Sequence, residues 1–320
     1  MDMNETHECS SMELPTPVSA VLILAYLMVG IASLFGNAFV ILVVVLRRQM
    51  RSVTNIFISS VSAADLVITS FSLWATPFAY YKQSWIFGQG MCYVVQAIQG
   101  ASLMWAPFTL AAIAVDRYLL VLSPYRPQMS TSTCILVIVG IWSGAFLVLT
   151  PMLEHLMYME VDDCHKFCIE FWKPHQVLRL GYGICVLTVR SAVPLAIISF
   201  CHWRIATILH AHHEKLMQQR SSTEASLSAD IKRKQRLQKL LLAMVLIFAI
   251  SSFPLDIRNV LVDFELAYDA NRKPEERLNL MSDEARHTLF YLSHWIAMAG
   301  TLLNPVVYAW WNDSFRAQIK

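Results

Sequence analysis

Charged residues are scarce in this chain, and their scarcity argues against a soluble globular protein. Asp, Glu, Lys and Arg make up 15% of the sequence, whereas a soluble domain carries roughly 25%. Apolar residues account for 56%, and the mean hydropathy is +0.47. The composition therefore predicts a membrane protein.

The sequence also lacks features that several other classes of protein require. Asp2, Glu5 and Glu8 are acidic, and no basic region precedes the first apolar run, so we expect no cleavable signal peptide. Seven cysteines are too few for a disulfide scaffold, and no Cys/His cluster has the spacing of metal ligands. We expect no metal site, no nucleic-acid partner and, without a nucleophile–base or paired-acid constellation, no enzyme activity.

Seven long apolar segments are what the chain does contain. A membrane helix needs ~20 residues at a rise of ~1.5 Å each. The segments cover residues 18–46, 54–81, 90–123, 131–154, 179–209, 238–264 and 286–310. The sequence thus predicts an all-α membrane protein: a seven-transmembrane helix bundle over residues 18–310, surrounded by membrane lipids, with an N-terminal tail over residues 1–17.

Basic residues mark alternate ends of these segments and set the expected orientation, because cytosolic connections carry an excess of Lys and Arg. Such residues follow segments one, three and seven and precede segment six: Arg47, Arg48, Arg51, Arg126, Lys232, Arg233, Lys234, Arg236, Lys239, Arg316 and Lys320. We therefore expect a multi-pass plasma-membrane protein whose N-terminus is extracellular. The sequon at Asn4 would then be accessible to glycosylation.

The third segment carries a cysteine at one end and an acid–base pair at the other. A helix from Cys92 to Asp116 is ~36 Å long, slightly more than the ~30 Å hydrocarbon core of a bilayer. A disulfide belongs outside the reducing cytosol, which places Asp116 and Arg117 on the cytosolic side. Taken alone, this pair has a simpler interpretation, an arginine that snorkels to the membrane surface.

Asp65 is an acid within the second segment. A charge at the bilayer centre costs at least ~2.5–3.5 kcal/mol, so Asp65 should face the bundle and have a partner. Asn37 and Asn304, in the first and seventh segments, are the candidates. On this interpretation Asp65 belongs to a polar contact that joins three helices.

The seventh segment ends in Asn304-Pro305-Val306-Val307-Tyr308. Together with Asp65, Asp116-Arg117-Tyr118 and Trp142, this motif resembles the rhodopsin-like (class A) G protein-coupled receptors over the whole chain. In that family the residue matching Asp116 holds the one matching Arg117 while the receptor is inactive. The resemblance implies coupling to a heterotrimeric G protein of the inhibitory class, with these activation residues: Asp116, Arg117, Tyr118, Asn304, Pro305 and Tyr308.

The same resemblance implies further features. It implies a disulfide between Cys92 and Cys168, and a short amphipathic helix on the membrane surface over residues 311–320. It also implies a sodium ion at Asp65, although Ser102 is one of few polar residues expected nearby. Two interpretations of Asp65, Asn37 and Ser102 therefore stay open: a sodium site, or a polar core that needs no ion.

Four stretches look like the neuropeptide Y / neuropeptide F group of peptide receptors. They are Gln96–Gly100, Cys168–Pro174, Pro254–Phe264 and His294–Ala299. This resemblance implies an extracellular peptide ligand bound by Gln99, Asn259, Asp263 and His294.

Residue chemistry points in the same direction. No acid lies between Cys92 and Asp116 to pair with an amine ligand. Asp263 lies one helical turn beyond Asn259, and a carboxylate next to an amide suits the planar donor fork of an arginine. We expect an amidated peptide ending in Arg-aromatic, with Arg258 and Arg190 as possible competitors for an acid in the pocket. The alternatives are a receptor of the tachykinin-like or RFamide-like subfamilies, or a membrane transporter, although the internal repeats of many transporters are not visible.

Overall fold

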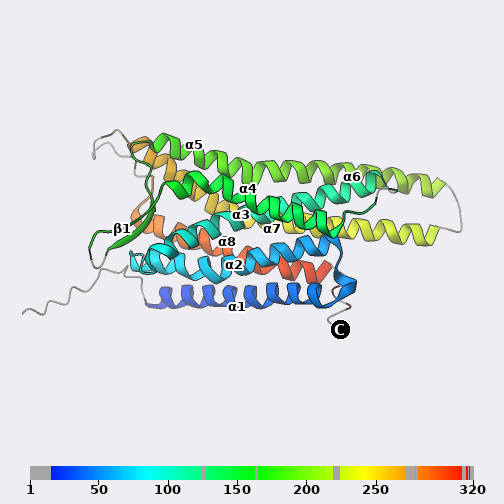
Figure 1. The fold of residues 1–320 in the computed structure, drawn as a ribbon, viewed down its shortest axis with the longest axis horizontal. Helices are drawn as coiled ribbons and strands as arrows, with labels where there is room; N and C mark the ends of the chain where they lie inside the picture. Colours follow the sequence, from blue (N-terminus) through cyan, green and yellow to red (C-terminus); the bar gives the residue numbers. More distant parts are fainter. Residues whose placement is uncertain are drawn as a thin grey trace, which may run out of the picture.

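The computed structural model describes residues 16–123, 125, 127–162, 165–218, 224–270, 272, 278, 280–311, 315 and 317. Long helices run side by side in one elongated bundle, and a β-hairpin lies across one end of it (Figure 1). The predicted fold class is confirmed, since the described residues form seven long helical segments in one bundle.

The helices agree closely with the predicted segments. The first four are α1 (Thr16–Leu46), α2 (Val53–Lys82), α3 (Gly88–Leu122) and α4 (Thr131–Glu154). The fifth is continuous through α5 (Gln176–Leu187), the π-helical turn η2 (Thr188–Ala192) and α6 (Val193–Gln218). The last two are α7 (Glu224–Asp269) and α8 (Asp283–Trp311).

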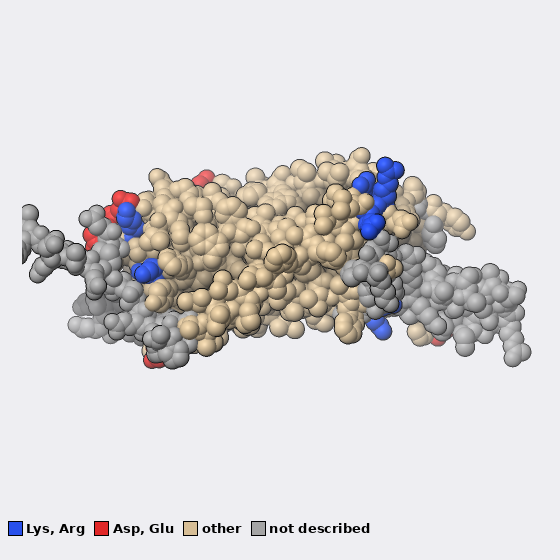
Figure 2. All heavy atoms as spheres, turned by 90° about the horizontal axis from the view of Figure 1, so that it is seen from below, with Lys and Arg blue, Asp and Glu red and all other residues tan. Residues whose placement is uncertain are grey.

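Six of the described helical segments are long and apolar enough to cross a membrane, and α8 is the seventh member of the bundle. It packs against α7, α1 and α2. Charged side chains gather towards the two ends of the face in Figure 2, with an almost uncharged belt between them. Phe35, Leu147 and Phe253 are among the large apolar side chains exposed along the helices, as expected of a surface in contact with lipid.

Polar residues at the helix ends explain where two of the helices begin. The Ser52 side chain accepts a hydrogen bond from the Asn55 backbone N–H at 3.4 Å, and Ser130 accepts one from Thr133 at 3.1 Å. Each serine satisfies one of the N–H groups that a helix N-terminus leaves without a partner.

Pro194 accounts for the local irregularity in the fifth helix. Proline has no backbone N–H, so the carbonyl of Arg190 loses its normal helical partner. The chain forms the π-helical turn η2 at this point, and the turn contains Arg190 itself. Single π-helical turns are often found at functional sites.

The sequence did not predict three short elements: the 3-10 helix η1 (Arg48–Met50), the turn η2 and a β-hairpin. Strand β1 (Leu156–Glu160) pairs antiparallel with β2 (Lys166–Glu170), and Tyr158 lies opposite Cys168. The N-terminal tail, including the sequon at Asn4, lies outside the described residues, as do Arg126 and most of the stretch after residue 311. The expectation that Cys164 is free or paired with Cys9 also falls on residues outside the described part of the chain.

Candidate functional site

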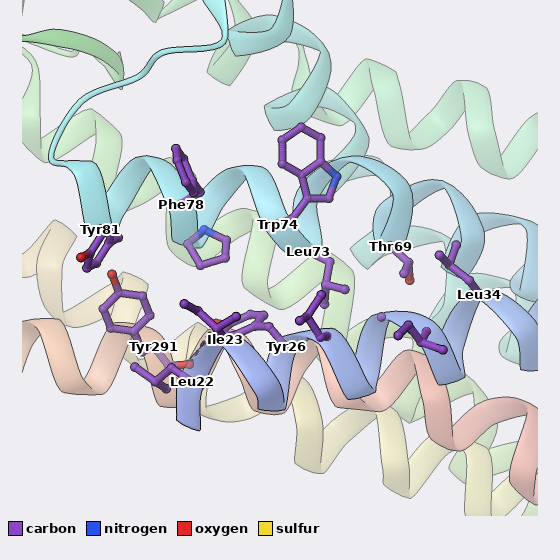
Figure 3. Close-up of a pocket in the computed structure, with 14 residues that line it drawn as sticks. Leu22, Ile23, Tyr26, Leu34, Thr69, Leu73, Trp74, Phe78, Tyr81 and Tyr291 are labelled. Atoms are coloured by element: carbon purple, nitrogen blue, oxygen red, sulfur yellow. Dashed lines mark hydrogen bonds between the residues drawn. The ribbon is translucent and has the colours of Figure 1, made fainter. Parts of the chain in front are cut away.

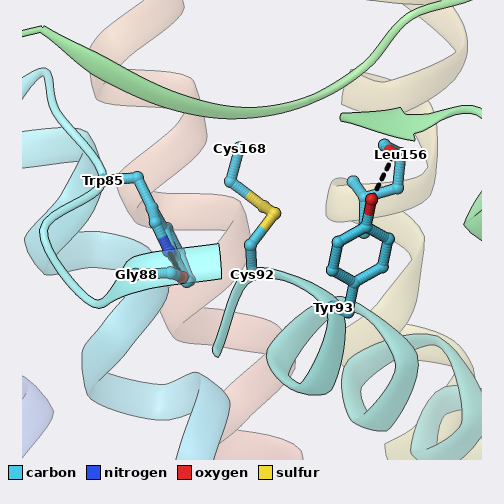
Figure 4. Close-up of a disulfide and its surroundings, with 6 residues drawn as sticks. All are labelled: Trp85, Gly88, Cys92, Tyr93, Leu156 and Cys168. Atoms are coloured by element: carbon cyan, nitrogen blue, oxygen red, sulfur yellow. Dashed lines mark hydrogen bonds between the residues drawn. A yellow bond between two sulfur atoms is a disulfide. The ribbon is translucent and has the colours of Figure 1, made fainter. Parts of the chain in front are cut away.

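A disulfide anchors the hairpin to the bundle. The bond joins Cys92, at the start of α3, to Cys168 in β2, with their Cα atoms 5.6 Å apart (Figure 4). The predicted pairing is therefore confirmed. The Trp85 backbone N–H donates to the Lys166 carbonyl at 2.6 Å, and the Tyr93 hydroxyl donates to the Leu156 carbonyl at 3.0 Å. These bonds fix both strands across the end of the bundle.

A cavity of about 320 Å³ lies within the bundle between α3, α5, η2, α7 and α8. The four residues predicted to bind the ligand come from three helices, and the structure brings all of them into its lining: Gln99, Asn259, Asp263 and His294. Three acids and three arginines also line the cavity: Glu170, Asp256, Asp263, Arg179, Arg190 and Arg258.

Asp263 has a cationic partner that the sequence analysis did not identify. Its Oδ1 accepts a hydrogen bond from Arg179 Nε at 2.7 Å, and both side chains are largely buried. Gly183, one turn after Arg179 on α5, permits this approach, because a Cβ there would lie 2.8 Å from Asp263 Oδ2. The pair therefore ties α5 to α7 at this level of the cavity.

Gln99 and His294 are held by neighbouring hydroxyl groups. Gln99 Oε1 accepts from Ser72 at 2.7 Å and from Thr76 at 3.3 Å. Because both acceptor positions are occupied, the side chain can offer a ligand only its NH₂ group. His294 is fully buried, stacks on Phe290, and has its Nδ1 3.1 Å from the Tyr26 hydroxyl.

A second ion pair lies deeper in the same cavity, between Arg190 on η2 and Asp256 on α7. The two residues are 8% and 7% exposed, so the pair is nearly withdrawn from solvent. Arg190 was predicted to compete for an acid in the pocket, and the acid it pairs with is Asp256. Arg258 donates to Asn259 Oδ1 at 3.1 Å and lies over the Phe290 ring.

Asp65, the acid in α2, is hydrogen-bonded to Asn304, which is one of its two candidate partners. Asn304 Nδ2 donates to Asp65 Oδ2 at 2.8 Å, which ties α8 to α2. The Asn37 amide instead donates to Ser33 and to the Thr301 carbonyl at 3.0 Å, which ties α1 to α8.

Ser102 lies on α3, which packs against α2. It is 7% exposed, and its Oγ has no hydrogen-bond partner among the described residues. A carboxylate and an unsatisfied hydroxyl are oxygen ligands of the kind that hard cations prefer. Asp65 on α2 and Ser102 on α3 are therefore residues of the chemical kind that would hold a sodium ion.

Asp116 and Arg117 form an ion pair at the far end of α3. Arg117 Nη2 lies 2.7 Å from Asp116 Oδ2, with the arginine side chain 27% exposed and the aspartate 6%. Tyr308 is fully buried in a core cluster that includes Ala114 of α3, with its ring 4.7 Å from that of Phe315. Pro305 packs closely on α1, since a Cβ on Gly36 would lie 2.9 Å from its ring.

An apolar groove of about 470 Å³ lies between α1 and α2 (Figure 3). Leu22, Leu34 and Phe78 are among the side chains that line it, and Tyr81 and Tyr291 lie at one end. None of the predicted ligand-binding residues contributes to this groove. Its surface suits the hydrocarbon tails of surrounding lipids.

Comparisons with known proteins agree with this geometry. The sequence profile described as "7 transmembrane receptor (rhodopsin family)" matches residues 36–308. The neuropeptide receptor npr-1 of Caenorhabditis elegans is 30% identical over 91% of this chain and 70% of its own length. Neuropeptide FF receptor 2 of Mus musculus is 29% identical over 93% of this chain and 71% of its own. Neuropeptide Y receptor type 2 of Macaca mulatta is 30% identical over 93% and 75%.

Proposed function

Since this chain belongs to the rhodopsin family of seven-transmembrane receptors, we propose that it binds an amidated extracellular neuropeptide and activates a heterotrimeric G protein of the inhibitory class. The similar proteins are named as neuropeptide receptors, which supports a peptide ligand. The family consists of receptors and not of enzymes, so this chain is not an enzyme.

The observation that carries the proposal is the convergence of Gln99, Asn259, Asp263 and His294 on one cavity. A volume of about 320 Å³ is at the small end of the ~300–1,000 Å³ range of ligand pockets. It has room for the last one or two residues of a peptide and no more. The remainder of the peptide would then contact the hairpin and the neighbouring ends of the helices.

An arginine in the ligand would bind Asp263 by exchange. Asp263 is occupied by Arg179, so the incoming guanidinium must take over that hydrogen bond. Arg179 also donates to the Glu170 carbonyl at 3.4 Å, and it can turn towards Glu170 when it is displaced. Neither guanidinium is then left without an acidic partner, which keeps the cost of the exchange low.

The amidated end of the peptide would bind near Gln99. The NH₂ group that Gln99 offers is a donor, and the carbonyl of a terminal carboxamide is a matching acceptor. His294, on α8, lines the same cavity, and its Nε2 is buried with no hydrogen-bond partner among the described residues.

At the other end, release of Arg117 from Asp116 would open the G protein site. This proposal places the N-terminus outside the cell and the Asp116–Arg117 end in the cytosol, as the distribution of basic residues predicts. A ligand can drive the change only through its difference in affinity for the two states.

Nucleotide exchange tests the whole proposal. Membranes containing the receptor are mixed with a purified inhibitory heterotrimer and a panel of amidated peptides ending in Arg-Tyr or Arg-Phe. We expect at least one peptide to accelerate exchange, and the same peptide with a free carboxylate to be much weaker. No acceleration by any peptide of the panel would contradict the proposal.

A further inference from the structure

The Arg190–Asp256 pair has no role in the binding scheme described above, yet it lies at the deep end of the cavity. Asp256 precedes Asp263 on α7 by two helical turns, or ~10 Å. Leu103, Met104 and Leu255 line the cavity as well and give it apolar walls. The ion pair is thus a charged group next to apolar walls of the cavity.

Stability alone does not account for this pair. A buried ion pair is often no more stable than apolar side chains of the same volume, because both charges lose their hydration. In addition, Arg190 Nε is buried and has no hydrogen-bond partner among the described residues. A buried donor without a partner costs ~1–3 kcal/mol, so a ligand atom that accepts from it gains that amount.

A hydroxyl group satisfies both members of the pair. Its oxygen can accept from Arg190 Nε, and its hydrogen can be donated to the Asp256 carboxylate. The unsubstituted ring of a phenylalanine can do neither and would leave the guanidinium donor unsatisfied.

The depth of the pair indicates which part of the ligand reaches it. When the guanidinium of a peptide arginine lies at Asp263, the ~10 Å is covered by that arginine side chain, one Cα–Cα step of ~3.8 Å and one aromatic side chain. A terminal aromatic residue next to that arginine is long enough, with its ring between the apolar walls and its para position at the ion pair.

We propose that Arg190 and Asp256 form a hydroxyl-binding site, and that the receptor selects a peptide whose terminal aromatic residue is tyrosine. The proposal rests on the proposed function and adds the identity of the last residue. It assigns a binding role to two residues outside the set predicted from the sequence.

Two amidated hexapeptides of identical sequence, one ending in Arg-Tyr and the other in Arg-Phe, provide the first test. Nucleotide exchange and competition binding on the unmodified receptor should show at least a ~10-fold preference for the tyrosine peptide. Equal potency, or a preference for phenylalanine, would overturn the hydroxyl site while leaving the proposed function intact. Failure of both peptides to act would overturn the proposed function and this inference with it.

A double substitution, Arg190→Met with Asp256→Leu, provides the second test. Because it replaces the whole pair by apolar side chains, it avoids leaving one buried charge alone. The tyrosine preference should disappear, and the phenylalanine peptide should become at least as potent as the tyrosine peptide. A preference that survives unchanged would show that the hydroxyl is recognised elsewhere and that the ion pair only joins the two helices.

The matched control is Arg286→Met with Glu265→Leu. Arg286 Nη1 and Glu265 Oε2 also form an ion pair, 2.8 Å apart, between α8 and α7, but neither residue lines the cavity. This variant should keep the tyrosine preference within about threefold of the unmodified receptor. Loss of the preference in the control as well would assign the effect to general weakening of the bundle and overturn the proposal.

Discussion

Asp263 and Arg179 form an ion pair across the mouth-side part of the cavity, with Nε and Oδ1 2.7 Å apart. The carboxylate proposed to bind the ligand is therefore already neutralised in the structure. In the proposed binding mode, the ligand arginine and Arg179 compete for Asp263, and the competition can be measured by changing either Asp263 or Arg179.

Replacing Asp263 by Ala should weaken an arginine-containing agonist about 30-fold or more. Removal of one partner of a buried charge pair typically costs ~2–5 kcal/mol. A peptide whose arginine is replaced by alanine should lose little, so competition binding with both peptides separates the two effects. Equal losses for the two peptides would mean that Asp263 matters only through its contact with Arg179.

Replacing Arg179 by Gln should have the opposite effect. The variant leaves Asp263 without its competitor, so an arginine-containing agonist should bind on the order of tenfold more tightly, or ~1.4 kcal/mol. The alanine-substituted peptide should not gain. Arg286→Gln is the matched control, because Arg286 pairs with Glu265 outside the cavity. A loss of affinity in Arg179→Gln would show that Arg179 itself contacts the ligand.

The helices could be predicted from the sequence because hydropathy reports directly on the thickness of the bilayer. The full lengths of the helices could not be predicted in this way. The helix α7 begins at Glu224, well before the predicted residue 238, because the polar residues that precede the apolar segment are helical too. Hydropathy identifies only the part of a helix that lies in the membrane. The backbone hydrogen bonds that define the helix can continue into polar sequence outside the membrane.

Contacts between helices were predicted less well, for a physical reason. The partners Arg179 and Asp263 are far apart in the sequence, and their contact depends on how α5 and α7 are rotated about their axes. The pairing of Asp65 with Asn304, in contrast, was among the contacts predicted, because an acid in the membrane has few polar residues to choose from.

Replacing Asp116 by Asn should raise ligand-independent nucleotide exchange. The substitution removes the charge that holds Arg117 at 2.7 Å, while the side chain keeps its size. Asp162→Asn serves as the control, since Asp162 pairs with His165 at the exposed hairpin turn. Basal exchange that is unchanged in Asp116→Asn would contradict the proposed restraint.

Replacing Arg117 by Ala should separate binding from signalling. Arg117 lies at the opposite end of α3 from the cavity, so peptide affinity measured without G protein should stay within about threefold of the unmodified receptor. Agonist-dependent exchange should be lost. If the variant still accelerates exchange normally, the cytosolic half of the mechanism is wrong.

The last prediction distinguishes a sodium site from a polar core at Asp65. If the carboxylate binds sodium and the ion favours the inactive state, replacing choline chloride by sodium chloride at constant ionic strength should lower agonist affinity. The Asp65→Asn variant should abolish this sensitivity, because it removes the charge but retains an acceptor for Asn304 Nδ2. Ser102→Ala should weaken the effect, since Ser102 Oγ has no other partner among the described residues. If agonist affinity on the unmodified receptor is the same in both salts, Asp65 and Asn304 act as a polar contact between α2 and α8 that needs no ion.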